Sequence, residues 1–216
     1  MKIVFCLPGP SFSGRFLQCW TELYRACLAS GITPILSQRY SCNIYYVRTL
    51  CAGGDVRGGE LQKPFSGTVD YDYMMWIDSD IEFTPKDFFN LLKHEKDISS
   101  GLYLMEGGKQ FACVKDWDEE FFKKNGRFQF LTPEDIKGHS DLIPVNYVGM
   151  GWMLVKRGVF EKIKYPWFEP LRKKIGDYTD FTMEDVTFCH KSLDAGFDIH
   201  IDPTIIVGHE KTVILK

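Results

Sequence analysis

The hydrophobic pattern of the first hundred residues alternates between short apolar runs and longer amphipathic segments. The apolar runs have strand character and cover residues 3–7, 33–37, 72–77 and 98–104. The segments between them have apolar positions at helical spacing and cover residues 16–29, 44–52 and 85–94. Strands that alternate with helices predict an α/β fold, in which a central, mostly parallel, twisted sheet is flanked by helices.

The second half of the chain has a less regular pattern. Residues 106–143 mix charges, aromatic residues and glycines, and they give only weak helix and strand signals. After them we expect an apolar run with two glycines over residues 145–155 and a short helix over residues 157–163. A helix that starts at a capping box is expected over residues 182–195, and strands are expected at residues 199–201 and 204–207. We interpret residues 1–216 as one domain, possibly excised from a longer protein, with halves of about 1–104 and 105–216.

Composition and charge exclude several classes of protein. The net charge of −3 and the pI of about 6.0 provide no basic field, which argues against a nucleic-acid partner. No run reaches the roughly 18 apolar residues that a membrane span needs. Seven cysteines form an odd set without a CxxC pair, which argues against a disulfide framework and favours a reducing, cytoplasmic setting.

The most informative motif follows the strand predicted at residues 72–77. Asp78 and Asp80 are spaced i, i+2, so on an extended backbone they would project to the same side. Two carboxylates placed in this way can hold one hard divalent cation, which keeps positions free for a substrate diphosphate. Aspartates are also common in a surface turn after a strand, which is the competing interpretation.

Other candidate groups follow predicted strands or begin predicted helices. His209 comes after the last strand, and an imidazole beside two carboxylates shifts the preference from Mg²⁺ to Mn²⁺. Glu184 and Asp185 lie in the first turn of a predicted helix, where the helix dipole favours carboxylates in any case. Arg48 has the donor geometry to bind a diphosphate, and a surface ion pair explains it equally well.

The order of these motifs resembles that of GT-A glycosyltransferases, close to the family 2 type. The resemblance rests on seven short segments: 3–9, 46–48, 76–80, 100–103, 148–154, 183–185 and 208–209. It is similar in particular to the N-terminal glycosyltransferase domain of a multi-domain chlorella virus protein. Such a resemblance implies transfer of a sugar from a nucleoside diphosphate sugar to a glycan acceptor in the cytoplasm, which would be the host cytoplasm for a viral protein.

The resemblance also implies roles for individual residues. Asp78, Asp80 and His209 would hold the Mn²⁺ or Mg²⁺ ion, and Asp185 or Glu184 would act on the acceptor hydroxyl or the donor sugar. The donor nucleotide would be bound by residues at the ends of the first two strands, namely Pro8, Gly9, Ser11 and Ser37. Arg48 and Ser79, which stands between the two aspartates, would also bind it. Gly151 and Trp152 would form a floor for the sugar or the acceptor, although Trp152 fits a core position equally well.

The resemblance leaves the donor and two alternative functions open. A UDP-sugar is favoured, either a UDP-hexose or UDP-L-rhamnose, and the acceptor would be chosen by residues 106–143. A sugar-nucleotide nucleotidyltransferase would need Lys or Arg in the loop after the first strand, and residues 8–14 contain neither. A non-catalytic nucleotide- or glycan-binding module with a decayed site is the second alternative, and the joint presence of four candidate residues argues against it: Asp78, Asp80, Asp185 and His209.

Overall fold

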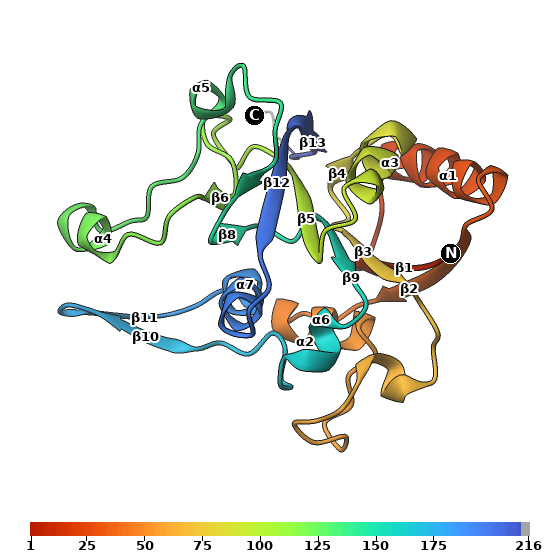
Figure 1. Ribbon diagram of the computed structural model, residues 1–216, viewed down its shortest axis with the longest axis horizontal. Coiled ribbons are helices and arrows are strands. Elements are labelled where there is room, and N and C mark those ends of the chain that lie inside the picture. The colour runs from red at the N-terminus through yellow and green to blue at the C-terminus, as the bar shows by residue number, and fades with distance from the viewer. Residues whose placement is uncertain (213–216) are drawn as a thin grey trace.

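The computed structural model describes residues 1–212. Its central sheet has seven strands in the order β2-β1-β3-β9-β5-β12-β7 (Figure 1). Their bounds are Thr33–Arg39 (β2), Lys2–Pro8 (β1), Tyr73–Ile77 (β3), Trp152–Lys156 (β9), Ile98–Leu102 (β5), Ile199–Ile206 (β12) and Ile143–Pro144 (β7). Only β9 and β7 run against the other strands, so the predicted mostly parallel sheet is confirmed.

Helices cover both faces of this sheet (Figure 1). On one face lie α1 (Gly14–Ala29) and α3 (Pro85–Lys93), and the other face is covered by α2 (Ile44–Cys51), α6 (Val159–Lys162) and α7 (Glu184–Asp194). The remaining helical segments are η1 (Pro64–Gly67), α4 (Glu119–Asn125) and α5 (Pro133–Ile136). No helix in residues 1–212 combines the length and the apolar character that crossing a membrane requires.

The two layers of the core follow from the alternation of side chains along the central strands. In β3, Met74 and Trp76 pack under the layer with α2, α6 and α7, whereas Tyr73, Met75 and Ile77 pack under the layer with α1 and α3. All five side chains are buried because both faces of the strand are covered. This explains why the strand reads in the sequence as a continuous apolar run.

Three small two-stranded sheets lie outside the central sheet. They pair β4 (Ile81–Glu82) with β13 (Gly208–His209), β6 (Cys113–Val114) with β8 (Tyr147–Val148), and β10 (Arg172–Ile175) with β11 (Tyr178–Phe181). The hairpin β10–β11 and the segment around α4 extend from the body in the same direction (Figure 1). The sequence pattern predicted neither β4, β13 nor the hairpin, because strands of two to four residues are too short to show a period.

Two sequence predictions about the last third of the chain are wrong. The predicted capping box at Thr182 does not form, because the Thr182 side chain binds the backbone of Leu171 and the hydroxyl of Thr187. The helix starts instead at Glu184, after Met183, without a side-chain cap. The strands predicted at residues 199–201 and 204–207 are one strand, β12, in which a register shift interrupts the pairing with β5.

Candidate functional site

The candidate site lies where β1 and β3 end side by side. Gly9 follows β1 with a φ of +147°, and a Cβ atom there would lie 2.8 Å from the Cβ of Ser79. Only glycine therefore lets the loop after β1 approach the turn after β3 this closely. A cavity of about 340 Å³ opens at this junction, lined by Pro8, Gly9, Pro10, Ser41, Cys42, Ile44, Val47, Asp78, Ser79 and Asp80.

The two aspartates do not share one side of an extended strand, as the sequence had suggested. β3 ends at Ile77, and the amide of Ile81 donates to the carbonyl of Asp78, which closes a tight turn. The turn directs Asp78 towards Arg48 and Asp80 towards His209. As a result, residues 1–212 contain no group of three or more His, Cys, Asp or Glu side chains that could hold a metal ion.

Asp80 is paired with two groups from the end of the described chain. His209 Nε2 and Lys211 Nζ lie 3.1 and 2.8 Å from the same oxygen, Oδ2. Pairing of β13 with β4 places His209 opposite Ile81, directly beside the turn. Burial of Asp80 opposes ionisation, but the hydrogen bonds from His209 and Lys211 outweigh it and lower the pKa of Asp80 to about 2.

The backbone fixes the orientation and the tautomer of His209. Its Nδ1 lies 2.7 Å from the carbonyl oxygen of Leu104, which can only accept a hydrogen bond, so Nδ1 carries a proton. Nε2 therefore faces Asp80, where it holds either a second proton or a free lone pair. The hydrogen bond to Asp80 raises the pKa of His209. A proton and a divalent cation would compete for this place between the two side chains.

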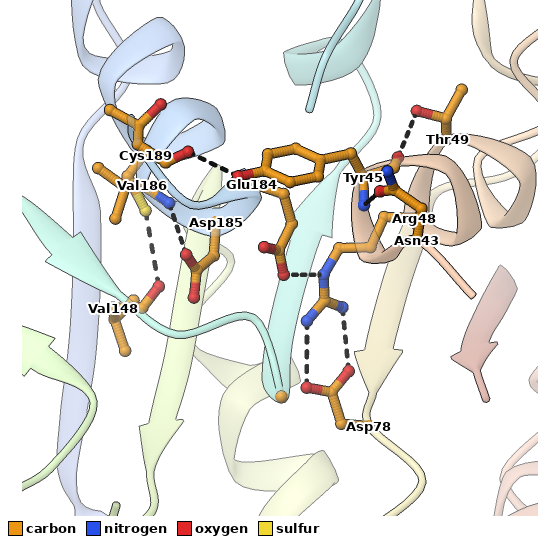
Figure 2. A network of polar contacts seen from close by, with 12 residues as sticks. Asn43, Tyr45, Arg48, Thr49, Asp78, Val148, Glu184, Asp185, Val186 and Cys189 are labelled. Carbon is orange, nitrogen blue, oxygen red and sulfur yellow. Dashed lines mark hydrogen bonds and ion pairs between the residues drawn. The ribbon is translucent and has the colours of Figure 1, made fainter. Parts of the chain in front are cut away.

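A buried ion cluster connects β3, α2 and α7 (Figure 2). The Arg48 side chain, 3% exposed, donates from Nε to Glu184 Oε1 at 2.9 Å. Its Nη1 and Nη2 face the two carboxylate oxygens of Asp78 at 3.0 and 3.1 Å. Burial opposes the charge on Arg48, but the two carboxylates raise its pKa, so the guanidinium stays charged. Hydrogen bonds from Nε and Nη2 and the ion pair of Nη1 place Arg48 to orient Asp78 and Glu184, and its burial behind these carboxylates argues against the expected diphosphate contact.

Asp185 is the second carboxylate of α7 and has a different environment. Its Oδ2 accepts a hydrogen bond from the hydroxyl of Tyr147 at 3.0 Å, and its Oδ1 accepts one from the amide of Val186 at 2.8 Å. Burial, followed by the charge of Glu184, raises the pKa of Asp185 to about 7. A carboxyl group with a pKa close to neutral can both take up and release a proton under ordinary conditions.

The other predicted site residues are distributed differently. Ser79 lines the cavity, Ser11 is exposed and is not part of its lining, and Ser37 is buried with its hydroxyl bound to the carbonyl of Cys51. Gly151 accepts a hydrogen bond through its carbonyl from the amide of Asp78 and so anchors the turn. The Trp152 side chain is fully buried against Phe83, which argues against its expected role as an acceptor floor.

Sequence reasoning missed several residues of the site. Lys211 stands two positions after His209, a spacing that could have linked it to Asp80. Ser41 and Cys42, which line the cavity, lie two and three positions after the end of β2 and could have been found from the rule that strand ends meet at one edge. Nothing in the sequence indicates the contact between Tyr147 and Asp185, because the two residues come from β8 and α7.

Comparison with known proteins gives structural neighbours only. No family model and no curated protein matches the sequence. The structure is similar to A197 from STIV, with a TM-score of 0.54 and 16% identity over 100% of this chain and 97% of that one. It is also similar to GalNAc-T7 solved with UDP, GalNAc and Mn²⁺, with a TM-score of 0.51 and 11% identity. That alignment covers 98% of this chain and 44% of the GalNAc-T7 chain.

A third neighbour has a comparable score. The catalytic domain of Drosophila β1,4-galactosyltransferase 7 in complex with xylobiose aligns with a TM-score of 0.51 and 15% identity, over 98% of this chain and 71% of that one. This chain has a GT-A fold. The predicted fold is therefore confirmed, and at these identities the likeness extends to the fold alone.

Proposed function

We propose that this chain is a glycosyltransferase that moves a sugar from a nucleoside diphosphate sugar to a hydroxyl group of a glycan acceptor. The observation that carries the proposal is the convergence of groups from four distant elements at the edge of the sheet where β1 and β3 end. Asp80 and His209 meet beside the cavity, and the Asp78–Arg48–Glu184 cluster connects that cavity to Asp185. On a GT-A fold, this edge is where an α/β sheet binds a nucleotide.

Asp80 and His209 fit a divalent cation. The hydrogen bond from Nδ1 to Leu104 leaves Nε2 facing the carboxylate of Asp80, which is the orientation that a metal-binding histidine needs. One nitrogen and one carboxylate favour Mn²⁺, with Mg²⁺ as the alternative. A cation bound there supplies Lewis-acid stabilisation of the charge that develops on the departing nucleoside diphosphate. Asp78 is assigned a supporting role, because Arg48 occupies both of its carboxylate oxygens.

The cavity beside Asp80 fits the nucleotide part of the donor. Pro8 and Gly9 bring the backbone to one side of it, and Ser79 offers a hydroxyl within reach of a ribose or a phosphate. The ammonium group of Lys211 lies at the same carboxylate and adds positive charge next to the expected diphosphate. Uracil is the favoured base by analogy with GalNAc-T7, which was solved with UDP.

Asp185 is the favoured proton acceptor for the hydroxyl group of the acceptor. Its pKa of about 7 leaves a substantial fraction ionised at neutral pH, and an ionised carboxylate is able to take the proton as the hydroxyl attacks. Tyr147 holds the carboxylate in place through its hydroxyl. Glu184 is less suited to this role, because Arg48 binds one of its oxygens and its side chain is only 5% exposed.

The identity of the sugar rests on the sequence resemblance to the chlorella virus domain. That resemblance favours a UDP-hexose or UDP-L-rhamnose as donor and a glycoprotein glycan as product. These details form the most specific part of the proposal. Turnover assays with UDP-glucose, UDP-galactose and UDP-L-rhamnose would separate them.

Calorimetric titration of UDP and of GDP, each with and without Mn²⁺, tests the donor site. The wild-type chain should bind UDP in a Mn²⁺-dependent manner, and Asp80→Ala should lose that dependence. Asp141→Ala, at an exposed aspartate that does not line the cavity, is the matched control and should bind as the wild type does. If neither nucleotide binds, or if binding ignores both the metal and Asp80→Ala, the proposal is wrong.

Turnover assays distinguish the alternatives. Release of UDP from a UDP-sugar, with water or a glycan as acceptor, supports a transferase. Release of pyrophosphate from UTP and a sugar phosphate would instead indicate a nucleotidyltransferase. Binding of UDP without turnover of any donor would indicate a non-catalytic binding module.

A further inference from the structure

A second cavity, of about 320 Å³, lies between the two arms that extend from the body of the molecule. One arm is the segment around α4, and the other is the hairpin β10–β11 (Figure 1). Six aromatic side chains line this cavity, which we call the aromatic groove: Trp117, Phe122, Phe128, Phe130, Tyr178 and Phe181. Phe181 and Tyr178 are 68% and 51% exposed, so the groove offers apolar surface to a ligand from solution.

The hairpin contributes mainly one of its two faces to the groove, and Phe181, which follows Asp180 at the end of β11, is the exception. Lys173 lies opposite Asp180 in the pairing of β10 with β11, and Ile175 lies opposite Tyr178. These four side chains line the groove, whereas the alternate residue Lys174 does not. The hairpin therefore supplies an apolar pair, a lysine and a carboxylate to the same cavity.

Ring contacts connect the arms. Trp117 and Phe128 pack with their ring centroids 3.7 Å apart and their planes tilted by 31°, and Phe122 packs against Phe128 at 4.8 Å. Phe122 also meets Tyr178 of the hairpin edge-on at 5.8 Å. Four of the six rings thus form one connected cluster that spans both arms, and Arg127 adds a second positive charge to the lining of the groove.

The groove leads to the carboxylates of α7. Its wall includes Met183 and Val186, which flank Glu184 and Asp185 in the sequence. A second path runs through side chains: Phe130 packs edge-on against Tyr147, whose hydroxyl donates to Asp185. The groove therefore borders the start of α7, where the proposed proton acceptor lies, and it contacts Asp185 indirectly through Phe130 and Tyr147.

We infer that the aromatic groove is the acceptor subsite and that it binds a pyranose ring of a glycan. A pyranose has an apolar face of C–H groups and an edge of hydroxyl groups. The aromatic rings match the apolar face of the sugar. Lys173 and Arg127 supply hydrogen-bond donors, and Asp180 supplies acceptors, for its hydroxyl groups. This inference rests on the proposed function, and it replaces Trp152 as the expected acceptor floor.

Methyl glycosides of glucose, galactose, mannose, xylose, fucose and rhamnose are suitable probes, because a methyl group cannot stack on the rings as an aromatic aglycone would. Saturation-transfer NMR with the full chain should detect at least one of them. Tyr178→Ala should weaken its binding by about threefold to tenfold, and Lys173→Ala should weaken it as well. Lys174→Ala is the matched control, since it lies one residue away on the opposite face, and it should leave binding unchanged.

The inference is wrong if no methyl glycoside binds the wild type, or if Tyr178→Ala and Lys173→Ala leave the affinity for the bound glycoside unchanged. Octyl β-D-glucoside serves as a further probe, because it carries both a sugar ring and an alkyl chain. Saturation of its alkyl chain rather than its ring would also overturn the inference. UDP titration of the same variants separates this inference from the proposed function. Loss of glycoside binding with intact Mn²⁺-dependent UDP binding identifies the groove as an acceptor subsite. Absence of UDP binding in the wild type would count against the donor site instead.

Discussion

At the scale of single residues, neighbouring side chains of α7 acquire different chemistry from their surroundings. Glu184 and Asp185 are consecutive, yet Arg48 pairs with Glu184, whereas the hydrogen-bond partners of Asp185 within residues 1–212 are the hydroxyl of Tyr147 and one backbone amide. Burial and the charge of Glu184 then raise the pKa of Asp185 to about 7. Two carboxylates in different environments can take different roles, one as a structural anion and the other as a proton acceptor.

Replacing Asp185 by Asn tests this assignment through both stability and activity. The folded protein holds the proton of Asp185 more tightly than the unfolded chain does, so its stabilising contribution is complete below about pH 4 and is lost as the pH rises through 7. Because Asn stays neutral, we expect Asp185→Asn to gain about 4 kcal/mol in unfolding free energy relative to wild type between pH 4 and pH 8. Urea unfolding at both pH values measures this difference.

The same variant should lose about 10²-fold to 10⁴-fold in transfer rate, and the wild-type rate should rise with pH through about 7. Asp194→Asn is the control, since that aspartate is exposed on the same helix. Full transfer activity in Asp185→Asn would exclude Asp185 as the proton acceptor.

At the scale of secondary-structure elements, the guanidinium of Arg48 holds three of them together. It comes from α2, and it pairs with Asp78 after β3 and with Glu184 at the start of α7. Those elements are separated by up to 136 residues of sequence. The same contacts turn Asp78 away from Asp80, so the positions of the helices decide which aspartate faces His209.

Arg48→Met should therefore destabilise the fold by about 3–5 kcal/mol, because it leaves the carboxylate of Glu184 buried without its partner. Urea unfolding at pH 7 gives the value. Arg57→Met removes an exposed arginine from its ion pair with Asp55 and should cause no measurable change. Equal effects of the two substitutions would show that the buried cluster contributes nothing to the packing of α2 against α7.

At the scale of the whole molecule, the two halves of the chain share one sheet. β9 comes from the second half and pairs with β3 and β5 of the first half. β12, also from the second half, pairs with β5 on its other side. Neither half can keep its strand neighbours without the other, and the organisation of residues 1–216 as one domain stays a prediction that unfolding experiments can test.

Calorimetry tests that prediction directly. We expect a single unfolding transition in which the calorimetric and van't Hoff enthalpies agree, because the shared sheet couples the two halves. A ligand that binds only the folded state stabilises that state, so Mn²⁺ and UDP should raise the midpoint temperature of the same transition. Two resolved transitions would show that residues 1–104 and 105–216 unfold as separate units.

The GT-A fold was expected from the resemblance in the order of seven short motifs. The sequence by itself determined the alternation of strands and helices, the α/β class that follows from it, and the position of Asp78 and Asp80 after a buried strand. These features are local or periodic: an apolar run buried on both faces, amphipathic helices, and polar residues where strands end. A helix or strand of ordinary length repeats its pattern often enough for the period to be visible.

Only the tertiary structure decided what each polar group faces. The tight turn after β3, the pairing of β13 with β4, and the packing of α2 against α7 separate Asp78 from Asp80 and bring His209 and Lys211 to the latter. The same packing buries Trp152 and forms the aromatic groove from two arms that have no periodic signal. Contacts between residues more than a hundred positions apart depend on the three-dimensional arrangement of elements, and no local pattern of side chains encodes them.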